Sequence, residues 1–316
     1  MTLRWPIVRR IRFGYQVVAA DDGDGLQTQV QRAEAAGFDT VHCSDHVGTG
    51  WAPLAMMLAM AEATTQISVG SLVLNNDLRH PVQLAREIAA IDRLSGGRVE
   101  LGLGAGHAFP EYQSIGVPFD PPAVRKARLA ESVEILRGLL DGDAVTYAGR
   151  HYHLEAVRTM PALRRVPILV GVNGRAALTH AARHADVISL TMTGRTLADG
   201  QRHAVRWEPE RLDRTVAHIR EAAGPRADSL ELNALIQAVV VTDDRAAAAA
   251  GIAKGVVGLT AADALTTPFL AIGTHDEIAD HLRACRDRWG ISYFSARDID
   301  TVAPVIDRIR RTETND

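Results

Sequence analysis

The sequence is poor in cysteine, in lysine and in long apolar runs, and each shortage excludes a class of protein. Its 316 residues include two cysteines, Cys43 and Cys285, which are far apart and indicate neither a disulfide framework nor a zinc pattern. Lysine occurs only at Lys126 and Lys254 and the formal net charge is -3, so no basic surface for nucleic acid is expected. The apolar stretch 53–61 is far shorter than the roughly 20 residues that cross a bilayer. We therefore expect a cytoplasmic, soluble protein with no metal, no nucleic-acid partner and no membrane partner.

The sequence is rich in short β-type runs that alternate with helical patterns, which predicts a parallel sheet wrapped by helices. The expected strands are 11–18, 40–43, 67–74, 99–103, 166–170, 187–190, 232–241 and 293–296. The expected helices are 26–36, 53–63, 81–94, 124–140, 176–184, 209–223, 246–257, 276–289 and 302–310. Eight β/α units favour an α/β fold of the closed (β/α)8 TIM-barrel type, one domain over residues 1–316. An open doubly wound sheet is the alternative.

Two segments interrupt this repeat. Residues 145–154, with a turn at Gly149-Arg150, predict a β-hairpin. Residues 191–208 are polar, unpatterned and too long for an ordinary connection, which indicates an inserted lid. We expect both segments to shape a substrate pocket.

Polar and glycine-rich residues follow four of the expected strands. They are 44–46, 75–77, 104–107 and 171–175. Because chemistry in such a barrel gathers at the carboxyl ends of the strands, these segments predict one site on one rim.

Asp45 and His46 close the second strand. A histidine there could exchange a proton near neutral pH, and the aspartate could bind a cofactor or fix a turn. The dipeptide alone favours a plain polar strand end, with Asp45 as a cap and His46 packed.

Two further motifs indicate a bound cofactor. The run Gly102–Gly106 does not open directly into a helix, which argues against a dinucleotide fingerprint. Its glycines, among them Gly104, would let the backbone approach a flat ring closely. The alternative is that they simply form a turn. Asn173, Gly174 and Arg175 precede a helix and could hold a phosphate, with a plain N-cap by Asn173 as the alternative.

Other kinds of catalytic site have little support in the sequence. The histidines show no metal-ligand spacing and no carboxylate cluster joins them, and no nucleophile-elbow pattern occurs. Without a nucleophile or a metal, we expect a barrel of this kind to use the chemistry of a cofactor.

Several motifs, taken in order, resemble the luciferase-like flavin and deazaflavin oxidoreductases. They are Gly37-Phe38-Asp39-Thr40-Val41, Ser44-Asp45-His46, Val69-Gly70-Ser71-Leu72-Val73-Leu74, Arg79-His80-Pro81 with Leu84-Ala85, and the segments 92–98 and 100–106. The resemblance covers essentially the whole chain and is strongest over residues 11–140.

This resemblance implies a barrel with insertions that pairs as a homodimer, and it favours the branch that uses coenzyme F420. It places Asp45 and His46 beside the reactive ring, which makes His46 the candidate proton donor or acceptor. It also implies a cis peptide at Leu72–Val73 behind the ring. The residues expected to bind the cofactor are Asp45, Leu72, Val73, Gly104, Gly106, His107, Asn173, Gly174 and Arg175.

The chain departs from the sugar-phosphate dehydrogenases of that branch. A glutamate and an asparagine of those enzymes are replaced here by His107 and Pro110, so the role of the glutamate is not carried over. His107 or Glu111 could substitute for it. Trp51 resembles an aromatic residue on the substrate side of the ring, or it packs as a hydrophobic staple on the next helix.

We therefore expect an F420-dependent reductase or dehydrogenase that transfers a hydride to or from a small organic substrate. The alternatives are an FMN-dependent monooxygenase that uses oxygen and a partner flavin reductase, and a non-catalytic flavin-binding paralogue. A metal-dependent hydrolase would need a ligand cluster, which the sequence does not indicate.

Overall fold

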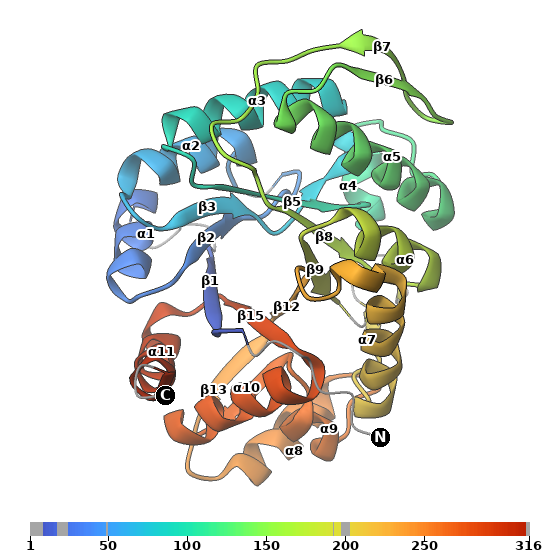
Figure 1. Cartoon of the computed structure of the whole chain (residues 1–316). Coiled ribbons are helices and arrows are strands. Elements are labelled where there is room, and N and C mark those ends of the chain that lie inside the picture. Colours follow the sequence, from blue (N-terminus) through green and yellow to red (C-terminus); the bar gives the residue numbers. More distant parts are fainter. Residues whose placement is uncertain (1–8, 18–24, 49, 192, 197–202, 314–316) are drawn as a thin grey trace.

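Parallel strands form a closed barrel at the centre of the molecule (Figure 1). The computed structural model describes residues 9–17, 25–48, 50–191, 193–196 and 203–313. The barrel strands are β1 (Arg12–Gln16), β2 (Thr40–Cys43), β3 (Ser68–Ser71) with its continuation β4 (Leu74–Asn75), β5 (Val99–Gly104), β8 (Ile168–Val172), β9 (Val187–Leu190), β12 (Glu231–Leu235) and β15 (Ile291–Ala296). Their order is β3-β2-β1-β15-β12-β9-β8-β5, with every pair parallel.

The pairing between β3 and β5 closes the barrel. Val69 lies opposite Val99, and Gly70 lies opposite Glu100. The predicted TIM barrel is therefore confirmed. The open doubly wound sheet is wrong, because β3 and β5, which lie at the two ends of the strand order, pair with each other and leave no open edge between them.

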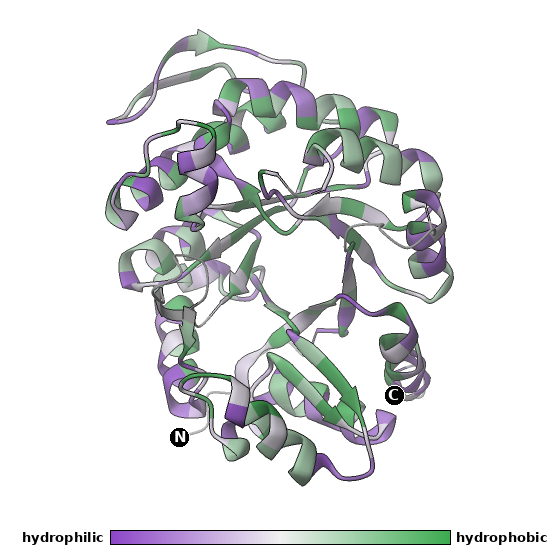
Figure 2. Ribbon diagram, turned by 180° about the vertical axis from the view of Figure 1, so that it is seen from behind, coloured by the Kyte–Doolittle hydropathy of each residue, from purple (hydrophilic) through white to green (hydrophobic). Residues whose placement is uncertain are grey.

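Eight helices surround the strands of the described chain (Figure 1). They are α1 (Leu26–Ala35), α2 (Pro53–Ala63), α3 (Pro81–Leu94), α5 (Pro122–Asp141), α6 (Arg175–His184), α7 (Pro209–Ala223), α10 (His275–Trp289) and α11 (Ile299–Glu313). Figure 2 shows apolar and polar residues alternating along these helices. In α3, for example, Leu84, Ile88 and Ile91 recur at helical spacing and are buried against the barrel.

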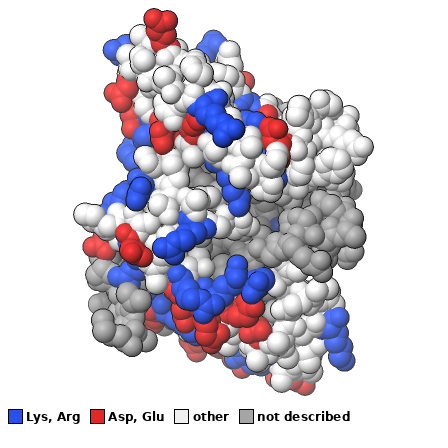
Figure 3. Space-filling model, turned by 90° about the vertical axis from the view of Figure 1, so that its right-hand side faces the viewer, with Lys and Arg blue, Asp and Glu red and all other residues white. Residues whose placement is uncertain are grey.

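Basic and acidic side chains are intermingled on the face shown in Figure 3. The surface pair of Arg288 with Asp213, 2.8 Å apart, illustrates the same mixture. Among the described residues, none of the helices has both the length and the apolar composition needed to cross a membrane.

A layer of charged side chains fills the barrel at the amino ends of its strands. Arg12 donates to Glu100 Oε2 and Glu231 Oε2, each at 2.9 Å, and its guanidinium lies 3.4 Å from the ring centre of Tyr293. Burial alone would raise the pKa of Glu100, but the charge of Arg12 and a hydrogen bond from His42 outweigh it and lower the pKa to about 2. A cavity of about 670 Å³ opens below this layer, at the end of the barrel opposite the predicted site.

Three insertions decorate the barrel. They are the hairpin β6 (Val145–Ala148) and β7 (His153–Val157), the antiparallel pair β10 (Thr193–Thr196) and β11 (His203–Val205), and the unit β13 (Ala238–Val241), α8 (Arg245–Gly255), α9 (Ala261–Thr266) and β14 (Leu270–Gly273). The remaining short helices are η1 (Asn76–Leu78), α4 (Phe109–Ser114) and η2 (Gly224–Arg226).

The predicted insertions agree with the structure in part. The β6–β7 hairpin packs on the outer side of α5, where Tyr147 donates to Glu134 at 3.0 Å, so it does not line the mouth of the barrel as expected (Figure 1). The segment 191–208 contains β10 and β11, while residues 192 and 197–202 lie outside the described residues. The single strand expected at 232–241 is two strands, because β13 leaves the barrel and pairs with β14.

Candidate active site

The carboxyl ends of β2, β4, β5 and β8 meet at one rim of the barrel, as the parallel pairing requires. The predicted site residues that follow these strands therefore lie on the same side of the molecule. Their side chains have different roles, because some are held in buried contacts and others face solvent.

Asp45 is a buried carboxylate that ties β2 to β4. Its Oδ2 accepts from the backbone N–H of Asn75 at 2.8 Å and from Arg79 Nη1 at 2.5 Å, and its Oδ1 accepts from Arg79 Nη2 at 3.2 Å. Only 6% of the Asp45 side chain is exposed. A bidentate guanidinium pair of this kind fixes geometry, so these contacts give Asp45 a positioning role in the loop that carries His46.

His46 is half-exposed and paired with a carboxylate. Its Nδ1 lies 2.7 Å from Glu111 Oε1, and Glu111 Oε2 accepts from the backbone N–H of Val47 at 3.3 Å. Because a carboxylate only accepts, Glu111 holds the proton on Nδ1 and leaves Nε2 of His46 for a substrate. This is the arrangement of an oriented general acid or base.

The two residues considered as replacements for the family glutamate both lie beside His46. His107 is exposed, and its ring packs edge-on against His46 with the ring centres 5.9 Å apart. Glu111, on α4, makes the direct hydrogen bond. Of the two residues, Glu111 is therefore the one whose carboxylate contacts His46.

Tyr112 anchors α4 to the rim. Its hydroxyl lies 3.0 Å from both Asn75 Oδ1 and Asp77 Oδ2, and its single proton is shared between these two acceptors. Burial, followed by the charge of Asp77, raises the pKa of Tyr112 to about 12, so the phenol stays protonated. Gly106 adopts a positive φ of 69° and leaves room for this hydroxyl, since a Cβ there would lie 1.9 Å from it.

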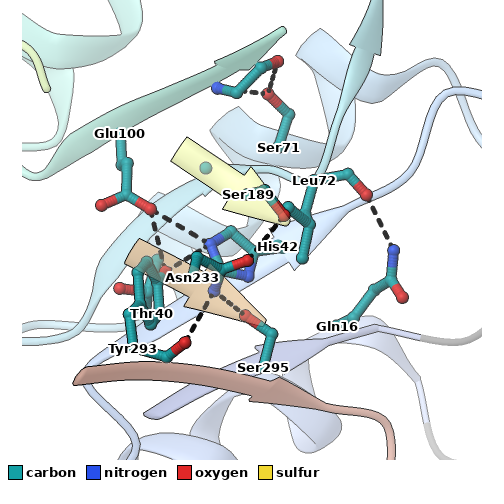
Figure 4. A network of polar contacts seen from close by, with 12 residues as sticks. Gln16, Thr40, His42, Ser71, Leu72, Glu100, Ser189, Asn233, Tyr293 and Ser295 are labelled. Atoms are coloured by element: carbon teal, nitrogen blue, oxygen red, sulfur yellow. Dashed lines mark hydrogen bonds and ion pairs between the residues drawn. The ribbon is translucent and has the colours of Figure 1, made fainter. Parts of the chain in front are cut away.

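The peptide bond between Leu72 and Val73 is cis, as the resemblance implied, and it separates β3 from β4. Gln16 Nε2 donates to the Leu72 carbonyl at 2.8 Å (Figure 4). The Leu72 side chain packs in a small apolar cluster inside the barrel with Leu169 and Tyr293.

The glycines of β5 make room for this bulge. A Cβ on Gly102 would lie 1.9 Å from the Ser71 carbonyl oxygen, and one on Gly104 would lie 2.7 Å from Val73 Cγ2. Ser71 Oγ also donates to the Gly102 carbonyl at 2.9 Å. A side chain on either glycine would therefore collide with the protein's own atoms, and the contact of these glycines with a cofactor ring stays a prediction.

A buried polar network continues from the charged layer into the barrel (Figure 4). The Tyr293 hydroxyl donates to Glu100 Oε1 at 2.8 Å and lies 2.7 Å from His42 Nε2. Nearer the carboxyl ends of the strands, Ser189 donates to Asn233 Oδ1 at 2.7 Å. These hydrogen bonds support the barrel interior, although the buried Nδ1 of His42 has no hydrogen-bond partner among the described residues.

The start of α6 is suited to an anion. Gly174 is the N-cap residue, with φ 86° and no side-chain cap, and Arg175 is exposed in the first turn. Asn173 does not cap the helix as the alternative expected; instead Lys126 donates to its carbonyl and to its Oδ1, each at 2.8 Å. Backbone N–H groups of this helix N-terminus lie beside Lys126 and Arg175, which are the group types that bind a phosphate, so the phosphate site stays a prediction that now includes Lys126.

Trp51 lies on the segment that follows β2, and 61% of its surface is exposed. That exposure does not fit a staple packed on α2, which would be largely buried. It leaves an aromatic face available beside the rim.

Three contributors to the rim were absent from the sequence-based site. Arg79 fixes Asp45, Lys126 fixes Asn173, and Tyr112 fixes Asn75. Each is a long-range contact. The available signals were that Arg79 belongs to a motif shared with the family and that Lys126 is one of only two lysines.

Relatives and solved structures resemble this chain over much of its length. An F420-dependent glucose-6-phosphate dehydrogenase of Nakamurella multipartita is 33% identical over 221 residues, which cover 64% of each chain. The coenzyme F420 dependent tetrahydromethanopterin reductase of Methanopyrus kandleri has a TM-score of 0.74 at 19% identity, over 95% of this chain and 100% of that one. An F420-dependent secondary alcohol dehydrogenase also has a TM-score of 0.74, at 20% identity over 96% of this chain and 100% of that one.

The relatives, the solved structures and the family model support different conclusions about this chain. The chain spans from 53% to 64% of the lengths of the first curated relatives that it matches, and the two solved structures support the fold. The sequence model described as luciferase-like monooxygenase matches residues 10–293, nearly the whole barrel. This chain therefore belongs to the luciferase-like monooxygenase family.

Proposed function

We propose that this protein is an F420-dependent oxidoreductase that transfers a hydride between the deazaflavin and a small organic substrate. The observation that carries the proposal is the 2.7 Å pair of His46 and Glu111 on the barrel rim. The Nakamurella relative and both solved structures are F420-dependent enzymes, which supports the choice of cofactor.

The residues present fit such a cofactor. Lys126, Arg175 and the uncapped N–H groups of α6 would hold its phosphate, and the segment around Leu72 and Val73 would stand behind its ring. When bound, the deazaflavin supplies a carbon centre that accepts or donates a hydride.

The chain's own residues would manage the proton that accompanies the hydride. Glu111 holds the proton on Nδ1 of His46, so Nε2 would take a proton from an alcohol or give one to a reduced product. The buried pair of Asp45 and Arg79 keeps the loop of His46 in place. Trp51, exposed on the same rim, would cover the substrate.

The test is equilibrium binding of F420 and FMN to the purified chain, side by side, by fluorescence quenching. We expect tight F420 binding and weak FMN binding, followed by hydride transfer in a screen of secondary alcohols, glucose 6-phosphate and, with reduced F420, activated alkenes and imines. Preference for FMN would overturn the proposal and favour the second candidate, an oxygen-dependent monooxygenase with a partner flavin reductase, which the family's description supports.

A His46→Ala variant separates catalysis from binding alone. If the protein is an enzyme, the variant loses turnover and keeps its affinity for F420. If it is a non-catalytic flavin-binding protein, the wild type shows no turnover either. His153→Ala, which removes an exposed histidine of β7, is the matched control.

We further propose that the chain acts as a homodimer in the cytoplasm. The family resemblance supports the dimer, and two buried, free cysteines, Cys43 and Cys285, suit a reducing compartment. Light scattering of the purified chain and cell fractionation test the two statements.

A further inference from the structure

A histidine pair and a glutamate meet on the outside of the barrel, away from the rim. His180 and His184 lie one turn apart on α6, and Glu134 reaches them from α5. Glu134 Oε1 is 2.8 Å from His180 Nε2 and 3.9 Å from His184 Nε2. The expectation that no carboxylate joins these histidines is therefore wrong, because the tertiary packing of α5 on α6 supplies one.

The three ligand atoms are spaced for a transition metal. All of them lie within 4.8 Å of one another, and the two imidazoles are stacked with their centres 4.4 Å apart. A tetrahedral zinc ion with bonds of about 2.0–2.1 Å needs ligand atoms about 3.3 Å apart. The observed Glu134–His180 and Glu134–His184 distances of 2.8 and 3.9 Å lie on either side of that value, and all three ligand atoms lie within 4.8 Å of one another, so side-chain rotations that move these atoms by about an ångström would complete the geometry.

We propose that Glu134, His180 and His184 form a binding site for a divalent transition metal ion of the Zn²⁺ class. Two imidazoles and one carboxylate make three protein ligands, and water completes the shell. The side chains of His180, Glu134 and His184 are 24%, 35% and 40% exposed, which gives an ion access from solvent.

The ion would join three parts of the fold. His180 and His184 belong to α6 and Glu134 to α5, while Tyr147 of the β6–β7 hairpin donates to the second oxygen of Glu134 at 3.0 Å. That hydrogen bond orients the carboxylate in the way that outer partners orient metal ligands. Binding would therefore stabilise the outer layer of the barrel without entering the proposed redox site.

The test uses the full chain freed of metal with a chelator and then titrated with Zn²⁺ by calorimetry. We expect one site, with affinity at least tenfold weaker in His184→Ala and in Glu134→Gln and unchanged in His153→Ala, an exposed histidine outside the cluster. Zinc should raise the melting temperature of the wild type and of the control but not that of the two site variants.

Two results would overturn the proposal. One is a wild-type chain that binds no zinc, in which case the cluster is a hydrogen-bonded histidine stack only. The other is folded His184→Ala and Glu134→Gln variants that both keep wild-type zinc affinity, which would place the ion elsewhere. Co²⁺ provides a second readout, because its visible absorption reports imidazole and carboxylate ligands directly and should be lost in both variants.

Discussion

Replacing Glu111 by glutamine tests the proposed role of His46 with a change of a single functional group. In the wild type, one carboxylate oxygen accepts from His46 Nδ1 and the other accepts from the N–H of Val47. A glutamine amide has one acceptor and one donor. It can keep the Val47 contact only by turning its NH₂ group toward His46, which moves the imidazole proton to Nε2.

The expected loss of activity is much larger than the loss of stability. An incorrectly oriented general acid or base costs about 100- to 1000-fold in kcat, or about 3–4 kcal/mol. Because His46 is 43% exposed, its contact with Glu111 contributes at most about 1 kcal/mol to folding. At about 2.1 cal/mol/K per residue of unfolding entropy, that lowers the melting temperature of a 316-residue chain by only about 1.5 °C.

Three measurements check this prediction. Steady-state turnover with the best substrate should fall as stated, F420 affinity should stay within about threefold, and the ¹⁵N shifts of His46 should show the proton moving from Nδ1 to Nε2. Glu87→Gln, at an exposed position of α3, is the control and should behave as the wild type. A Glu111→Gln enzyme with near-normal kcat would refute the reasoning.

Three further predictions concern cofactor affinity, packing and acid stability. Lys126→Met should weaken F420 binding about 10- to 100-fold and reduce its salt dependence in fluorescence titrations, because a charge-assisted contact beside the α6 N-terminus is lost. Gly104→Ala places a methyl group 2.7 Å from Val73 and should lower the melting temperature by about 2–5 °C, whereas Gly251→Ala, with open space around it in α8, should not. The pKa of Glu100 is lowered to about 2 from an ordinary 4.5, which contributes about 3 kcal/mol to the free energy of unfolding above pH 4.5. This contribution is lost as the pH falls toward 2, so the free energy of unfolding of Glu100→Gln should depend less on pH over that range.

The sequence predicted the barrel well because its signals are local. The helices at 53–63 and 81–94 have the predicted bounds, since each begins with proline at its first position. The strand expected at 67–74 is interrupted at Leu72–Val73, and the strand expected at 232–241 is divided between two sheets. A run of β-branched residues shows that a strand forms but not which partner it pairs with.

The site was predicted less completely because its geometry depends on long-range contacts. Asp45 and His46 are adjacent in sequence, yet Arg79 and Glu111, which hold them, are 34 and 65 residues away. The sequence draws attention to both residues, but it does not show which side chains they contact. The prediction named Glu111 as a possible replacement for the family glutamate, and the structure supplies the contact with His46.

The charged layer of Arg12, Glu100 and Glu231 has a kinetic consequence. Because it fills the amino end of the barrel, we expect cofactor and substrate to share one entrance, at the rim that carries His46. Molecules that bind one above the other through the same entrance leave in the reverse of the order in which they bind. A large cofactor that arrives first is then retained while small substrates exchange above it, so turnover should follow a compulsory order, with the substrate second in and its product first out.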